Sequence, residues 1–157
     1  MSSITIATLS RMSCETLASI LASPAASNLA IVDVRDSGPF PPLRTHLVFS
    51  AYVLPDHVGG HIRSSLWVPG SQLDYRTPEL VHQLQHKAQV VFHCMLSQQR
   101  GPNAALRYAR EQRRLLGEEA SQHQEVFVLD GGFATWQAKY GEDGALTEAY
   151  VRDIWLD

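Results

Sequence analysis

The sequence has few cysteines and no long apolar run. Its 157 residues include two cysteines, Cys14 and Cys94, which are too few for a disulfide framework and suit a reducing compartment. No apolar stretch is long enough to cross a bilayer, and residues 1–5 lack the basic-then-apolar pattern of a secretory signal. We therefore expect an intracellular protein of the cytoplasm, the nucleus or both, without a membrane partner.

An excess of charge of one sign is also missing. The net charge is −3, and charged residues make up 18% of the chain against 45% for hydrophobic residues. This composition is ordinary for a globular domain and offers no basic surface for nucleic acid. The sequence contains no internal repeat and no Cys/His spacing typical of a metal site. We expect one domain over residues 1–157, with no nucleic-acid partner, no metal and no bound cofactor.

Short apolar runs alternate with segments of helical character. The runs at 29–34, 90–92 and 126–129 lack the in–out alternation of half-exposed strands, which is typical of strands covered on both faces. A shorter strand is predicted at 66–68. Helices are predicted from Ser10 or Ser13 to Leu21, from Thr77 onward, from Pro102 to Leu116, and over a last segment containing Phe133 and Trp136. This order predicts an α/β fold with a central, mostly parallel sheet and helices on both faces.

The most informative stretch joins the strand at 90–92 to the helix that begins near Pro102. A loop of this length before a helix N-terminus can turn its backbone N–H groups inward and bind an anion. Arg100 can close such a loop with a planar guanidinium that holds two oxygens of a tetrahedral oxyanion. The predicted substrate-binding residues are therefore Met95, Leu96, Ser97, Gln98, Gln99 and Arg100.

Cys94 stands at the base of this predicted anion-binding loop. Helix N-termini and guanidinium groups lower thiol pKa values from ~8.5 to roughly 3.5–7.5, and the thiolate is the nucleophilic form. An oxyanion held over a thiolate is placed for in-line attack on its central atom. Cys94 and Arg100 are therefore the predicted catalytic residues. The alternative is a buried structural thiol, which the position of Cys94 between a strand and a helix disfavours.

The order His93-Cys94, five residues and Arg100-Gly101-Pro102 resembles the active-site signature of the M-phase inducer phosphatases. It also resembles that of the small rhodanese-fold arsenate reductases and related phosphatases of fungi and plants. Further landmarks of that family follow in their usual order, at residues 31–35, 59–62, 68–69 and 128–133. The resemblance implies a rhodanese-like fold and a cysteine-dependent phosphatase or arsenate reductase. For arsenate reduction it implies an external reductant, glutathione, with glutaredoxin as a partner.

Three residues outside the loop are predicted to support it. His93 is expected to shape the loop by hydrogen bonding and to add positive potential when protonated. Asp33 and Arg35 follow the first strand, at the edge where open α/β sheets place their sites. They either touch substrate or, as we favour, pair with each other beneath the active site. Cys14 as a resolving thiol and His61 as a base are further alternatives, which their positions in the sequence disfavour.

The helix after the loop carries several arginines. They either form a basic rim that attracts an acidic or phosphorylated partner or lie on a solvated helix surface, which we favour. The four are Arg107, Arg110, Arg113 and Arg114.

The segment 38–55 departs from the family pattern. Without it, Val34-Arg35-Asp36 would lead to Gly59-Gly60 with the usual spacing. Residues 47–54 can be read as an extra edge strand or as an apolar flap near the site, and the whole segment as an intron translated in frame. We interpret it as a poorly integrated insertion without catalytic residues. Abundant peptides from residues 43–52 in the natively expressed protein would eliminate the intron interpretation.

Three reactions fit the loop: phosphoester hydrolysis, arsenate reduction, and sulfur transfer through a Cys94 persulfide. Sulfurtransferases of this family typically have a loop one residue shorter, so the length here favours a tetrahedral oxyanion. Met95 and Gln99 stand where M-phase inducer phosphatases have carboxylates, which favours small substrates or arsenate over proteins. A non-catalytic rhodanese-like binding module is the remaining alternative, and the intact Cys94 and Arg100 argue against it.

Overall fold

A five-stranded sheet forms the centre of the computed structural model, which describes residues 3–36 and 59–156. The strands lie in the order β1-β6-β5-β2-β4, and every neighbouring pair is parallel. Their bounds are β1 (Ser10–Met12), β2 (Leu29–Asp33), β4 (Leu66–Trp67), β5 (Gln89–His93) and β6 (Glu125–Leu129). Two further strands, β3 (His61–Ile62) and β7 (Thr147–Glu148), pair antiparallel beside this sheet. The predicted parallel α/β fold is thereby confirmed.

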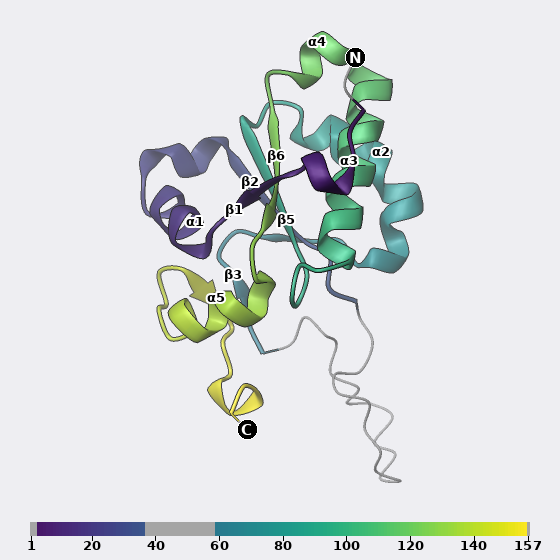
Figure 1. Ribbon diagram of the computed structural model, residues 1–157. Coiled ribbons are helices and arrows are strands. Elements are labelled where there is room, and N and C mark those ends of the chain that lie inside the picture. Colours follow the sequence, from purple (N-terminus) through teal and green to yellow (C-terminus); the bar gives the residue numbers. More distant parts are fainter. Residues whose placement is uncertain (1–2, 37–58, 157) are drawn as a thin grey trace, which may run out of the picture.

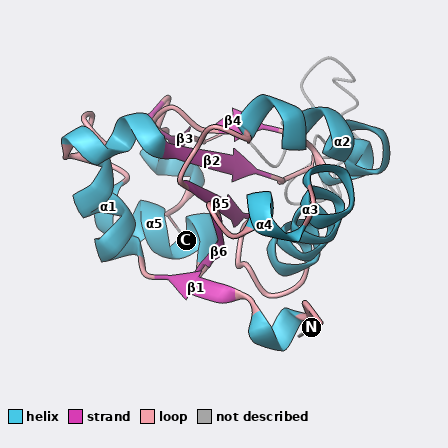
Figure 2. Ribbon diagram, turned by 90° about the horizontal axis from the view of Figure 1, so that it is seen from above, coloured by secondary structure: helices cyan, strands magenta, loops and turns pink. Residues whose placement is uncertain are grey.

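Helices cover both faces of the sheet (Figures 1 and 2). α1 (Cys14–Leu21) and α5 (Gly132–Tyr140) lie on one face. α2 (Leu73–Leu84) and α3 (Arg100–Leu116) pack side by side on the other, and the short α4 (Glu118–Ser121) follows α3. The predicted insertion at 38–55 lies outside the described residues.

Two hydrophobic cores flank the sheet because successive residues of a strand point to opposite faces. Val32 and Phe92 belong to the core under α2 and α3, together with Tyr108. Ile31 and Val91 belong to the core under α1 and α5. Both faces are therefore buried, which explains why these strands read as continuous apolar runs.

The N-terminal region holds a strand that the sequence analysis missed. Ser10 pairs with Phe127 as part of β1, so the prediction that a helix could start at Ser10 is wrong. The other predicted start is confirmed, because the Ser13 hydroxyl accepts a hydrogen bond from the N–H of Thr16, 3.1 Å away, and caps α1. A strand of three residues is too short to be recognised from the periodicity of its side chains. β1 forms because it can pair with β6 at the edge of the sheet.

The second helix also differs from its prediction. α2 begins at Leu73, whereas the Thr77-Pro78 pair predicts a start at Thr77. Thr77 instead lies within the helix and donates its hydroxyl proton to the carbonyl oxygen of Leu73. Pro78 removes one hydrogen bond near the N-terminal end, a cost that the burial of Leu73, Leu80 and neighbouring residues offsets.

The C-terminal tail docks on the domain. The Trp155 ring packs against Phe133 with centroids 5.3 Å apart, and its Nε1–H donates to the carbonyl of Gly59 over 2.9 Å. Gly59 has a φ of +102°, and a Cβ there would lie 3.1 Å from the Trp155 ring nitrogen. The glycine is therefore required both by its backbone conformation and by this close approach.

Candidate active site

The predicted anion-binding loop joins β5 to α3 at the carboxyl edge of the sheet (Figure 1). β5 is the middle strand, hydrogen-bonded to β6 on one side and to β2 on the other. Its residues Val90, Val91 and Phe92 are fully buried, so the strand holds Cys94 at a rigid position. α3 begins at Arg100, the residue that ends the loop.

Two backbone N–H groups point to the sulfur of Cys94. The N–H of Ser97 points to Sγ over 3.2 Å, and the N–H of Gly101 points to it over 3.4 Å. The side chain is almost completely buried, with 3% of its surface exposed. Donors converging on one atom from a loop and a helix N-terminus form an environment suited to an anion.

Ser97 has the backbone conformation that closes the loop. Its φ is +56°, in the left-handed region that residues other than glycine rarely adopt. Strain of this kind persists where surrounding contacts fix it, and here it turns the Ser97 N–H toward sulfur. The Ser97 hydroxyl is buried and has no hydrogen-bond partner among the described residues.

The N-terminus of α5 holds the outer side of the loop. The N–H of Phe133 donates to the carbonyl of Cys94 over 3.0 Å, and that of Ala134 donates to the carbonyl of Met95 over 2.9 Å. These bonds turn the loop carbonyls away from the sulfur, which leaves the N–H groups facing it. Gly132 permits the approach, because a Cβ there would lie 2.5 Å from the Met95 carbonyl oxygen.

Gly132→Ala is expected to displace the anion-binding loop, although Gly132 lies outside it. The added methyl meets backbone atoms, and the φ of Gly132 is +61°, so the strain should cost about 1–3 kcal/mol in the free energy of unfolding. Displacement of the loop by a fraction of an ångström should lower kcat roughly 10- to 100-fold. Urea unfolding and initial rates measure the two effects. Gly144→Ala is the matched control, because a Cβ there meets nothing within 4 Å, and equal effects of both variants would contradict the assignment.

His93 is fully buried at the end of β5. Its Nδ1–H donates to the carbonyl of Cys94 over 3.1 Å, and Nε2 has no partner among the described residues. Burial lowers the pKa of the ring below its ordinary value; the neighbouring Asp33 opposes this shift and Arg35 adds to it. His93 is therefore neutral near pH 7, which corrects the prediction that it adds positive potential. Its hydrogen bond does help to shape the loop.

The lowered pKa of His93 predicts a loss of stability in mild acid. His93 takes up a proton more readily in the unfolded chain than in the folded protein. The free energy of unfolding therefore has its full value above the ordinary histidine pKa of 6.5 and falls as the pH drops below it. Urea unfolding between about pH 7.5 and 5 measures this slope. His93→Asn retains a donor in place of Nδ1–H and should flatten the slope, whereas His82→Gln on the surface of α2 should not. If the pH dependence of the free energy of unfolding were unchanged in His93→Asn, His93 would not be its cause.

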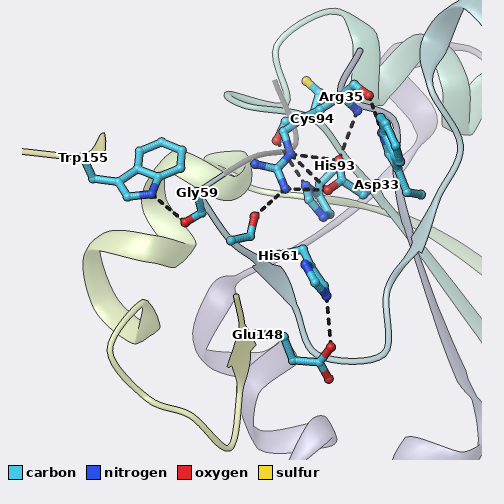
Figure 3. Close-up of polar contacts among 10 residues, drawn as sticks. Asp33, Arg35, Gly59, His61, His93, Cys94, Glu148 and Trp155 are labelled. Carbon is cyan, nitrogen blue, oxygen red and sulfur yellow. Dashed lines mark hydrogen bonds and ion pairs between the residues drawn. The ribbon is translucent and has the colours of Figure 1, made fainter. Parts of the chain in front are cut away.

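Asp33 and Arg35 pair with each other beneath the loop (Figure 3). Both are fully buried, and the Arg35 Nη2 lies 2.6 Å from Asp33 Oδ2 and donates to the carbonyl of Gly60 over 2.9 Å. The guanidinium also lies over the Phe133 ring, 4.1 Å from its centroid. Burial by itself would raise the pKa of Asp33, but neighbouring positive charge holds it below its ordinary value. Because His93 is neutral, Arg35 supplies the stabilising charge.

Arg100 is held at the mouth of the loop by a residue that the sequence analysis did not single out. Its Nη1 lies 3.3 Å from Oδ2 of Asp36, and both side chains are about half-exposed. The other oxygen of Asp36 accepts the N–H of Ser71 over 3.3 Å. Asp36 follows the end of β2, so the rule that α/β sites lie at the carboxyl ends of strands could have found it.

A cavity of about 370 Å³ opens above Cys94. Arg100 closes one side of it, and the remaining wall comes from four other loop residues, namely Met95, Leu96, Gln98 and Gln99. Ser97 is buried and does not line the cavity, although it was predicted as a substrate-binding residue together with these. Its backbone N–H faces the sulfur instead.

The two disfavoured candidates for a catalytic role, Cys14 and His61, contact residues outside the Cys94 loop. Cys14 is buried with its thiol 3.7 Å from the carbonyl oxygen of Asp130, and burial raises the pKa of that thiol. It is therefore a poor resolving thiol. His61 Nε2 lies 3.0 Å from Glu148, on the antiparallel pair β3–β7, which fits the structural interpretation (Figure 3).

The described residues contain no group of three or more His, Cys, Asp or Glu side chains that could hold a metal ion. In the same part of the chain, no helix is long and apolar enough to cross a membrane.

Comparison with known proteins agrees with this geometry. A family model described as the rhodanese-like domain matches residues 14–139. The CDC25-like phosphatase YCH1 of Saccharomyces cerevisiae is 37% identical over 111 residues, which cover 64% of this chain and 72% of that protein. Arsenate reductase 2.2 of Oryza sativa subsp. japonica is 31% identical over 112 residues, which cover 69% of each.

A solved structure shows the same fold. It is that of Ygr203w, described as a yeast protein tyrosine phosphatase of the rhodanese family, with a TM-score of 0.69 and 30% identity over 98% of this chain and 100% of that one. These matches confirm the enzyme class that the resemblance implied, a cysteine-dependent phosphatase or arsenate reductase. The chain belongs to the rhodanese-like domain family.

Proposed function

We propose that this protein hydrolyses phosphomonoesters through a covalent intermediate on Cys94. The observation that carries the proposal is the pair of backbone N–H groups, from Ser97 and Gly101, that converge on Sγ beneath a cavity closed by Arg100. Such a site can seat a tetrahedral dianion with its central atom in line with sulfur. The likeness to a CDC25-like phosphatase supports this choice of substrate class.

Each group has a role in the proposed reaction. Cys94 attacks phosphorus while the phosphorus–oxygen bond to the leaving group breaks, which gives a phosphocysteine. Arg100 and the loop N–H groups bind the equatorial oxygens, whose charge rises in the transition state. Water then attacks phosphorus and releases the Cys94 thiolate. Met95 and Gln99 cannot donate a proton to the leaving oxygen, so esters with acidic leaving groups, such as aryl phosphates, should react fastest.

Arsenate reduction is a second candidate, favoured by the likeness to a rice arsenate reductase and by the lack of an acid at Met95 and Gln99. Arsenate has the shape and charge of phosphate, so Cys94 can displace one of its oxygens and form a sulfur–arsenic bond. A glutathione thiolate then attacks the Cys94 sulfur, and the electron pair of the broken bond reduces arsenic to arsenite. Glutaredoxin is the proposed partner that reduces the resulting Cys94–glutathione disulfide.

Three assays on the wild-type protein test these proposals. The substrates are an aryl phosphate, arsenate with glutathione and glutaredoxin, and thiosulfate with cyanide. We expect turnover of the aryl phosphate, competitive inhibition by arsenate, and no thiocyanate formation. Turnover of arsenate alone would replace the first proposal with the second. Thiocyanate formation would establish a sulfurtransferase, and no turnover at all would establish a binding module.

The setting of this activity is also a proposal. Residues 1–157 form one rhodanese-like domain into which residues 38–55 are inserted. Cys14 and Cys94 are both free thiols, which supports an intracellular location in the cytoplasm, the nucleus or both.

A further inference from the structure

A second cavity adjoins the active site along α3. It has a volume of about 470 Å³, within the range of ligand pockets. Arg100 lines both this cavity and the one above Cys94, so the two meet at that guanidinium. We call the second cavity the side pocket; its lining also includes Asp36, Leu73, Asn103 and Arg107.

Arg107 repeats the position of Arg100 two turns further along the helix. Seven residues advance an α-helix by ~10.5 Å and return a side chain to nearly the same face. Asn103 lies between them on that face and lines the same pocket. The side pocket therefore has a guanidinium at each end, with an amide group between the two.

The present partner of Arg107 can be exchanged. Its Nη1 pairs with Asp74 in the first turn of α2, and the two side chains are 50% and 81% exposed. Water screens such a pair strongly, and its ordering entropy offsets much of the attraction. An anion held in the pocket by other contacts can therefore replace Asp74 at little cost.

We propose that the side pocket binds an acidic side chain of an extended phosphopeptide whose phosphate occupies the Cys94 loop. An extended chain advances ~3.3 Å per residue and its side chains alternate between two faces, so the residues two and four positions from the phosphorylated one face the same way as it does. They lie ~7 and ~13 Å from it, which brackets the ~10.5 Å between Arg100 and Arg107. The amide of Asn103 can bond the peptide backbone between them. This inference rests on the proposed phosphatase function and adds its substrate class, an acidic phosphotyrosine peptide, in place of the small substrates that the sequence favoured. The phenol of tyrosine is an aryl leaving group, which the site can release without a strong proton donor.

Binding to the Cys94→Ser variant tests the inference without turnover. Three phosphotyrosine peptides are compared by fluorescence anisotropy at low ionic strength. One has Glu at the second and fourth residues after the phosphotyrosine, one has Glu at the second and fourth residues before it, and one has Gln at all four positions. We expect one Glu peptide to bind about three- to fivefold more tightly than the Gln peptide, as suits an exposed charge pair.

A second substitution, added to Cys94→Ser, shows which residue causes the preference for the Glu peptide. Arg107→Gln should abolish the preference for Glu, and Asp74→Asn should increase it by removing the competing carboxylate. Arg114→Gln is the matched control: it removes the same charge from an exposed ion pair on the same helix, but ~21 Å from Arg100, and should leave the preference intact. Equal binding of all three peptides, no binding of any, or a preference that survives Arg107→Gln would overturn the inference.

Failure of the inference can be separated from failure of the proposed function. If the wild-type protein turns over an aryl phosphate while the Cys94→Ser variant shows no Arg107-dependent preference, the side pocket alone is wrongly assigned. If the wild-type protein turns over no phosphoester, the proposed phosphatase function fails, whatever the peptides bind.

Discussion

Cys94→Ser is expected to lower kcat for an aryl phosphate by at least about a thousandfold. A serine hydroxyl stays protonated at neutral pH and attacks phosphorus far more slowly than sulfur does. The substitution leaves the loop N–H groups and Arg100 in place, so the folded variant should still bind phosphate or arsenate. Initial rates measure the loss of turnover, and calorimetry with arsenate measures the binding that remains.

Cys14→Ser is the matched control for this prediction. It makes the same chemical change at the other free thiol, which is buried against Asp130 and away from the loop. We expect its kcat to stay within about twofold of the wild-type value when rates are normalised to folded protein. A Cys94→Ser variant that retained a tenth or more of the activity would contradict the covalent mechanism.

Alkylation tests the loop independently of any substrate. Iodoacetamide should react with Cys94 in the folded protein, and phosphate or arsenate should slow that reaction by occupying the cavity above it. Mass spectrometry of the digested protein separates this adduct from one on Cys14. An alkylation rate that neither anion changes would show that the oxyanion does not sit over this sulfur.

Arg35→Met is expected to lower the free energy of unfolding by about 3–5 kcal/mol. The substitution leaves the fully buried Asp33 carboxylate without the guanidinium that now holds it through three N–H contacts of 2.6–3.0 Å. It also removes the bond to the Gly60 carbonyl and the stacking on Phe133. Urea unfolding at neutral pH measures the change.

Two further variants test whether the lower stability of Arg35→Met comes from the unpaired Asp33 carboxylate. Adding Asp33→Asn to Arg35→Met removes the carboxylate charge, so the double variant should recover part of the lost stability. Arg152→Met removes an exposed arginine paired with Glu142 at 3.5 Å and should cost less than about 1 kcal/mol. Equal costs for Arg35→Met and Arg152→Met would refute the role of the buried pair.

The strand–loop–helix unit around Cys94 could be predicted from the sequence because its determinants are local. The apolar run at 90–92, the loop length and the start of α3 all lie within fourteen consecutive residues, 89–102. The Asp33–Arg35 pair is also local, since its members are two residues apart. Its contacts with Gly60 and Phe133 are not, and no sequence signal pointed to them.

The errors in the prediction arise where tertiary contacts override local signals. Thr77-Pro78 has the composition of a helix start, yet the burial of Leu73 extends α2 to an earlier residue. His93 titrates near neutral pH in water, yet complete burial lowers its pKa and leaves it neutral. In both cases the environment that decides the outcome is built by residues distant in the sequence.

The sequence by itself determined the parallel α/β architecture and the cysteine–arginine loop, because strand burial, loop length and helix propensity act over neighbouring residues. The class of chemistry followed from the resemblance of that loop to a known family. Only the tertiary structure decided how that loop is held. Gly132 lies against the loop carbonyls although it follows Met95 by 37 positions in the sequence. Asp36 contacts Arg100 although it precedes that residue by 64 positions. These contacts depend on which strands become neighbours in the sheet, and the packing of both faces fixes that order, which no local pattern encodes.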